Sequence, residues 1–134
     1  MSTDAMHAAK ASYERCCDRP EFFHSFYQNF FEACPNAKPM FAQTDFDRQA
    51  RLLRHAINLL LIFPNQPSEE PTLLSRLAER HSRRDLNVNP EWYPLFISSL
   101  VHTVAAYDPE FSQDLNRAWY TALSQGMEYL RSRY

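Results

Sequence analysis

The sequence predicts an all-α protein, and three observations support that prediction. Glycine occurs once, at Gly126, whereas the tight turns of β-hairpins need glycine at positive φ. The nine prolines fall between segments whose apolar residues recur three or four positions apart, where prolines typically end helices. The length of 134 residues suits one hydrophobic core, so we expect residues 1–134 to form a single domain.

The N-terminal part predicts two helices and a turn. The first covers residues 3–17 and stops before Pro20. The second covers residues 21–34 and ends at Pro35, and a short turn follows at residues 39–41. The apolar stripe of the second helix consists of Phe23, Tyr27, Phe30 and Cys34.

The clearest amphipathic pattern lies in residues 45–63. One face carries Phe46, Ala50, Leu53, Ile57 and Leu60, and the opposite face carries Arg48, Arg51, His55 and Asn58. Three prolines then predict a loop, in which Ser68 is a candidate cap of the next helix.

Three more helices are predicted in the C-terminal half. The first covers residues 71–84, and a polar connection follows at 85–90. The second covers 91–107, and the third covers 109–131 with Asp108-Pro109 as its cap and first-turn proline. The apolar stripe of the first of these helices is Leu74, Leu77, Ala78 and His81.

Composition excludes several classes of protein. A net charge of −2 gives no basic surface for nucleic acid and no polybasic membrane anchor. The longest apolar run, residues 59–63, is too short to span a bilayer, and residues 1–4 do not resemble a signal peptide. We therefore expect a cytoplasmic protein. Three cysteines, an odd number, argue against a disulfide framework.

His81 is the candidate metal-ligating residue. A histidine on an apolar stripe is most often a core residue that hydrogen-bonds a carbonyl group. An imidazole above apolar residues is also suited to present a ligand to haem iron. The facing wall would be the helix over 45–63, and Tyr27 and Gln49 would supply a polar pair inside the pocket.

Several motifs occur in a fixed order, and together they resemble the single-domain bacterial globins and the globin domains of haem-based sensors. The motifs are Phe26-Tyr27-x-x-Phe30-Phe31, Pro35, Met40-Phe41, Gln49, Leu77-Ala78-x-x-His81, Tyr93-Pro94 and Ala118-Trp119. The resemblance covers about residues 10–132. It implies a globin fold of about six to seven helices around one non-covalent haem b.

The resemblance also implies a role for individual residues. His81 matches the proximal iron ligand, Tyr27 the distal tyrosine, and Phe41 the ring stacked on the porphyrin. Gln49 matches the polar residue of the distal helix, although a shift of one position would place Arg48 there. We prefer Gln49 because this register also puts Phe46 on the haem face. The other expected haem contacts are Phe30, Ala50, Leu53, Leu77, Arg80, Val88 and Tyr93. For Arg80 and Arg84, pairing with a haem propionate and simple solvation are equally good interpretations.

The resemblance implies reversible binding of dioxygen, carbon monoxide or nitric oxide at ferrous iron, for gas sensing or oxygen binding. The alternative is a haem enzyme, a nitric oxide dioxygenase or a peroxidase-like protein, which would need an external reductase. A haem-free globin fold is a third hypothesis, and the presence of both His81 and Phe41 argues against it. Sensor globins often dimerise through their last two helices. Tyr107, Tyr120 and Tyr129 would suit such a homodimer interface, and ordinary surface tyrosines are an equally good interpretation.

Overall fold

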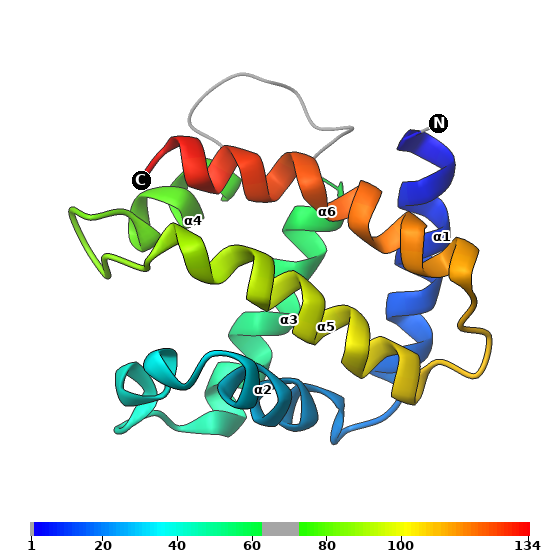
Figure 1. The fold of residues 1–134 in the computed structure, drawn as a ribbon, viewed down its shortest axis with the longest axis horizontal. Helices are drawn as coiled ribbons and strands as arrows, with labels where there is room; N and C mark the ends of the chain where they lie inside the picture. The colour runs from blue at the N-terminus through cyan, green and yellow to red at the C-terminus, as the bar shows by residue number, and fades with distance from the viewer. Residues whose placement is uncertain (1, 63–72) are drawn as a thin grey trace.

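Six α-helices and two 3₁₀-helices make up the chain in the computed structural model, which describes residues 2–62 and 73–134 (Figure 1). In chain order they are α1 (Ser2–Cys17), α2 (Phe22–Ala33), η1 (Pro35–Phe41), α3 (Phe46–Ile62), α4 (Leu73–His81), η3 (Pro90–Trp92), α5 (Tyr93–Tyr107) and α6 (Gln113–Ser132). No strand occurs in this part of the chain, so the all-α prediction is confirmed.

The helices pack as two extensive pairs, α1 against α6 and α2 against α5, and α3 crosses behind α5 (Figure 1). Large side chains from several helices are fully buried where they meet, among them Trp119, Phe22, Phe26 and Ile57. Burial of such apolar side chains is the main favourable contribution to folding. The core is therefore built from every long helix of the described chain.

The only glycine lies at a helix crossing and not in a turn. A Cβ atom added to Gly126 of α6 would come within 2.7 Å of the Leu60 Cδ2 atom of α3. Leu60 itself is buried. Gly126 thus allows α3 and α6 to approach closely.

Two predicted helix ends are wrong. The helix predicted over 71–84 ends at His81, where the Ser82 hydroxyl donates to the Glu79 carbonyl oxygen at 2.6 Å and a turn begins. The last helix begins at Gln113, capped by the Ser112 hydroxyl, and not at Asp108-Pro109. The candidate cap Ser68 lies outside the described residues.

The Asp108 carboxylate has a different role, because it closes a buried network with α1. It accepts hydrogen bonds from the Ser12 hydroxyl at 2.5 Å and from Arg15 Nε at 2.7 Å. The Trp119 indole donates to the same Ser12 hydroxyl at 3.0 Å. Burial raises the pKa of Asp108, but these hydrogen bonds outweigh it and hold the pKa below its ordinary value.

Two smaller expectations can be compared with the structure. The three cysteines are free thiols. Of the tyrosines expected on an outer face, Tyr107 is half-buried and hydrogen-bonds Ser25, whereas Tyr120 is exposed. No helix in the described residues is long and apolar enough to cross a membrane.

Candidate functional site

His81 is the last residue of α4, and its ring is held by the helix itself. The Nδ1 atom lies 2.9 Å from the carbonyl oxygen of Leu77, one turn earlier. The main-chain carbonyl of His81 accepts a hydrogen bond from the Val88 amide at 2.9 Å, which closes the following loop. Both the ring and the backbone of His81 are therefore fixed by neighbouring residues.

This arrangement suits a neutral imidazole with one nitrogen available. A carbonyl oxygen only accepts hydrogen bonds, so Nδ1 carries the proton and Nε2 keeps its lone pair. Burial lowers the pKa of His81, and the positive charge of Arg80 lowers it further, although the Leu77 carbonyl raises it. A neutral imidazole oriented through its other nitrogen is the usual state of a metal-binding histidine.

A polar pair joins α2 to α3. The Gln49 side-chain amide donates to the Tyr27 hydroxyl oxygen at 2.9 Å. Because Gln49 uses the oxygen of that hydroxyl, its hydrogen stays available for donation to another group. Burial raises the pKa of Tyr27 to about 12, so the phenol stays protonated at neutral pH. Arg48, the alternative to Gln49, is exposed to solvent.

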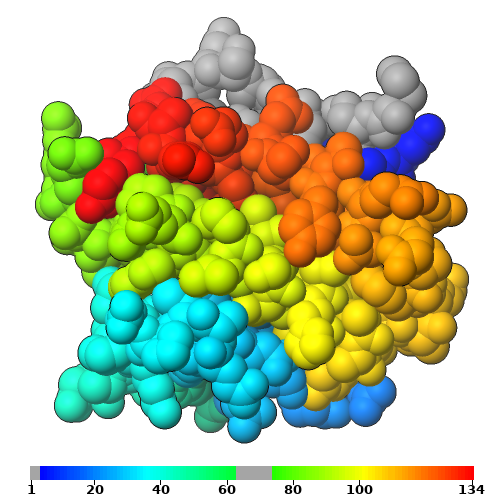
Figure 2. Space-filling model, in the orientation of Figure 1, coloured from blue at the N-terminus to red at the C-terminus, as the bar shows by residue number. Residues whose placement is uncertain are grey.

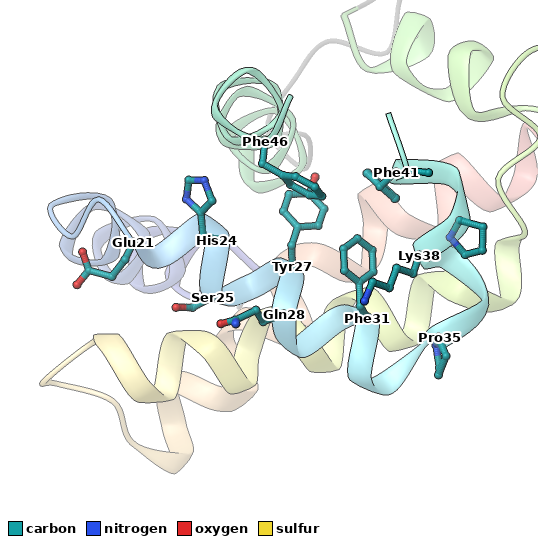
Figure 3. Close-up of a pocket in the computed structure, with 12 residues that line it drawn as sticks. Glu21, His24, Ser25, Tyr27, Gln28, Phe31, Pro35, Lys38, Phe41 and Phe46 are labelled. Atoms are coloured by element: carbon teal, nitrogen blue, oxygen red, sulfur yellow. The ribbon is translucent and has the colours of Figure 1, made fainter. Parts of the chain in front are cut away.

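Aromatic rings surround the Tyr27 side chain (Figure 3). Its ring centroid lies 5.4 Å from that of Phe41, 5.5 Å from Phe46 and 5.7 Å from Phe31. These rings come from α2, η1 and the first residue of α3. Together these rings form an apolar wall around one polar hydroxyl. The high phenylalanine content of the chain, ten residues, supplies most of this wall.

Part of the apolar surface near this site is only half covered by protein. The half-buried apolar side chains that pack against the core include Phe41, Phe46, Ala50, Leu77, Val88, Trp92 and Phe96. They come from η1, α3, α4, η3, α5 and the loop after α4, and two of these elements, α3 and α4, carry Gln49 and His81. Apolar side chains left half-exposed on several neighbouring elements are typical of a ligand site.

These residues fit haem. The donor set is one neutral imidazole, which is an axial ligand that haem iron takes in globins. The half-buried apolar side chains would cover the faces of a flat apolar ring, and the Tyr27 hydroxyl is a hydrogen-bond donor for a small ligand.

Other predicted site residues are placed as follows. Leu53 and Tyr93 are buried, and burial raises the pKa of Tyr93 to about 12. Phe30 is buried and its ring stacks on Phe26, with centroids 5.8 Å apart. Arg80 is exposed and its guanidinium donates to both carboxylate oxygens of Asp85, at 3.0 and 3.2 Å.

A surface pocket lies on the outer side of the apolar wall around Tyr27. The pocket, of about 890 Å³, lies over α2 and η1 and is lined by Tyr27, Phe31, Phe41 and Phe46 together with polar residues such as His24 (Figure 3). His81 does not line it. We therefore do not equate this pocket with the haem site, because a haem site needs the iron ligand in its wall.

Three residues of this region were not among the haem contacts expected from the sequence. Phe31 belongs to the wall around Tyr27, and Trp92 and Phe96 are half-buried at the start of α5. The spacing of Trp92, Tyr93 and Phe96 on one helix turn was the signal that could have identified them.

A family model described as Globin matches residues 24–128, a segment that contains Tyr27, Phe41, Gln49 and His81. The chain belongs to the globin family. Globins bind haem and, through it, diatomic gases, so this globin is a haem-binding protein by family. A crystal structure from Pseudomonas aeruginosa, of a protein described as structurally highly homologous to a human hemoglobin, is similar over nearly the whole chain. Its TM-score is 0.91 with 32% sequence identity, and the match covers 97% of this globin and 98% of that chain. No curated protein matches.

Proposed function

We propose that residues 1–134 form one globin domain that holds haem b through the Nε2 atom of His81 and reversibly binds a diatomic gas, for gas sensing or for oxygen binding. The observation that carries the proposal is the state of His81. Its Nδ1–H group donates a hydrogen bond to the Leu77 carbonyl, so the unprotonated Nε2 atom would be the iron ligand. When bound, haem supplies an iron atom with one position for a gas molecule.

The protein side chains would set the properties of that position. The Tyr27 hydroxyl would donate a hydrogen bond to a polar gas ligand, and Gln49 would orient the hydroxyl by donating to its oxygen. The wall formed with Phe41 and Phe46 would exclude water. Dioxygen carries more partial negative charge when bound than carbon monoxide does, so the tyrosine favours dioxygen.

The test is absorption spectroscopy of the purified protein in the oxidised, reduced and carbon monoxide-treated states, for wild type and His81→Ala. We expect wild type to contain haem and His81→Ala to lose it, because the strong protein–iron bond is removed. The matched control is His55→Ala, because His55 is an exposed histidine of α3.

A second variant separates loss of the ligand from loss of the fold. Imidazole added to His81→Gly fills the vacated position, so it should restore haem binding if His81 is the ligand. Wild-type spectra in His81→Ala would contradict the ligand assignment. Sustained consumption of nitric oxide with an added reductase would contradict gas binding as the function and favour the enzyme.

A further inference from the structure

A second cleft lies where the end of α6 meets α4 and the turn after it. Figures 1 and 2 show the C-terminal end of the chain beside α4. The cleft has a volume of about 560 Å³, within the range of small-molecule sites. All nine of its lining residues are polar or charged, and four of them are arginines: Arg76, Arg83, Arg84 and Arg133. This lining differs from the aromatic pocket over α2 and indicates a polar ligand.

The cleft is separate from the haem site. Successive residues of an α-helix are rotated by about 100°, so Arg76 and Glu79 lie on one side of α4 and Leu77 and His81 on the other. Both Arg76 and Glu79 line the cleft, whereas neither Leu77 nor His81 does. A ligand here would therefore bind the outer face of α4 and not haem.

The charge of the cleft is positive although the whole chain has a net charge of −2. The lining contains four arginines and one acidic side chain, that of Glu79. Counting about half a negative charge for each of the two helix C-termini that end near the cleft leaves about two net positive charges. Within residues 2–62 and 73–134, no ion pair involves Arg76 or Arg84.

Two of the arginines are already held in place. Arg83 Nε donates to the Tyr134 carbonyl oxygen at 3.1 Å, and its guanidinium lies 4.6 Å from the centroid of the Tyr134 ring. The Arg133 guanidinium lies 4.9 Å from the centroid of the Tyr129 ring. A guanidinium fixed in this way loses less conformational entropy when it binds an anion.

The arginines are the charged donors that the cleft offers to a ligand. The Ser82 hydroxyl donates to the Glu79 carbonyl and the Ser132 hydroxyl to the Tyr129 carbonyl, at 2.6 and 2.7 Å. Their hydrogens are therefore already used within the helices. Guanidinium groups match the oxygens of phosphate with two parallel hydrogen bonds.

We propose that this cleft binds a small soluble molecule with one or two phosphate groups, through Arg76, Arg83 and Arg84. A phosphate compound satisfies the geometry of several guanidinium groups and balances the local positive charge. The limited size of the cleft and the negative charge of the whole chain favour a small molecule over nucleic acid.

The test is titration calorimetry of the purified protein with pyrophosphate and with inorganic phosphate at constant ionic strength. We expect pyrophosphate to bind more tightly than phosphate. Arg76→Gln and Arg84→Gln should each weaken binding by about tenfold or more, the usual effect of losing a charge-assisted hydrogen bond. The double variant should abolish binding. Arg117→Gln, on an exposed arginine of α6 outside the cleft, should leave it unchanged.

A conservative variant keeps the test informative if a glutamine variant does not fold. Arg84→Lys retains the charge but not the paired donors, so it should bind pyrophosphate with an intermediate affinity. Equal affinity in wild type and in the Arg76→Gln/Arg84→Gln variant would overturn the proposal. So would tighter binding of a single-stranded oligonucleotide with the same arginine dependence. The measurement needs no haem, so its result is independent of the function proposed for His81.

Discussion

The side chains at the two ends of this globin are buried and paired to different extents. At one end, Ser12, Arg15, Asp108 and Trp119 close a hydrogen-bonded network between α1, the α5–α6 corner and α6. The Trp119 side chain is fully buried there. At the other end, around Phe41 and its neighbours, the apolar side chains stay half-buried.

This difference separates the part of the molecule that is stable by itself from the part that depends on a ligand. In the network around Asp108, every buried polar atom has a protein partner, so nothing further is needed. Half-exposed apolar side chains add further to the stability of the folded protein only when a ligand covers them. We therefore expect ligand-independent stability at the Asp108 end and ligand-dependent stability at the Phe41 end.

The largest expected effect compares two aromatic truncations, one at each end. Trp119→Ala should lower the free energy of unfolding by about 3–5 kcal/mol, as for other buried large aromatics, with or without haem. Phe41→Ala should cost less than about half of that in the haem-free protein, because its ring is half-buried. Denaturant unfolding of both forms measures the two costs.

An equal loss of unfolding free energy in Phe41→Ala and Trp119→Ala, measured in the haem-free protein, would contradict the expected difference between the two ends. A cost of Phe41→Ala that rose on haem binding, with an unchanged cost of Trp119→Ala, would support the expected difference between the two ends. Tyr120→Ala provides the control, because Tyr120 is an exposed aromatic residue of α6.

The next effect concerns Asp108 and acid. Asp108→Asn should lower the free energy of unfolding by about 2–3 kcal/mol at neutral pH, because charge-assisted hydrogen bonds are lost. The folded-state pKa of Asp108 lies below its unfolded value. Its contribution is therefore fully present above about pH 4 and is lost as the pH falls through the folded pKa.

Unfolding measured between neutral and acidic pH checks this sign. The stability difference between wild type and Asp108→Asn should shrink as the pH falls below about 4. A difference that grew towards low pH would contradict the assignment, since it would require a raised pKa. Asp114→Asn, an exposed carboxylate paired with Arg117, should show neither effect.

The smallest expected effect concerns Tyr27 and gas release. Tyr27→Phe should speed dioxygen dissociation from the haem-loaded protein by about tenfold, which corresponds to about 1.4 kcal/mol. Carbon monoxide dissociation should change much less, because this ligand gains little from a hydrogen-bond donor. Stopped-flow displacement measures both rates. Equal changes for the two gases would leave Tyr27 as a core tyrosine.

Gln49→Leu tests the same pair from the other side. Loss of the Gln49 amide removes the group that orients the Tyr27 hydroxyl, so the dioxygen rate should rise by less than in Tyr27→Phe. A larger effect for Gln49→Leu would mean that the glutamine, and not the tyrosine, is the donor.

Much of the fold could be predicted because its signals are local. The spacing of Phe46, Ala50 and Leu53 defines α3, and the prolines mark where neighbouring helices end. The start of α6 could not be predicted in the same way. Asp108-Pro109 has the pattern of a helix start, but Ser12 and Arg15, more than ninety positions away, bind the carboxylate.

The candidate site was predictable in part for a similar reason. The position of His81 on the apolar stripe of α4 predicted a hydrogen bond to a carbonyl group, and the structure identifies its partner as the Leu77 carbonyl. The pairing of Gln49 with Tyr27 depends on how α2 and α3 cross, so sequence alone left Arg48 as an alternative. The role of Arg80 could not be predicted, because Arg80 pairs with Asp85 across the turn after α4, and helix periodicity does not describe contacts across a turn.

Gly126 has a consequence for how far this sequence is free to diverge. At other positions of the core, a substitution exchanges one side chain for another and neighbours repack around the change in volume. At Gly126 even the smallest side chain meets the end of the Leu60 side chain, so the adjustment falls on a buried residue of α3, the helix that also carries Gln49. A mutation on α6 would thus be felt on α3 first as a rearrangement of the Leu60 side chain.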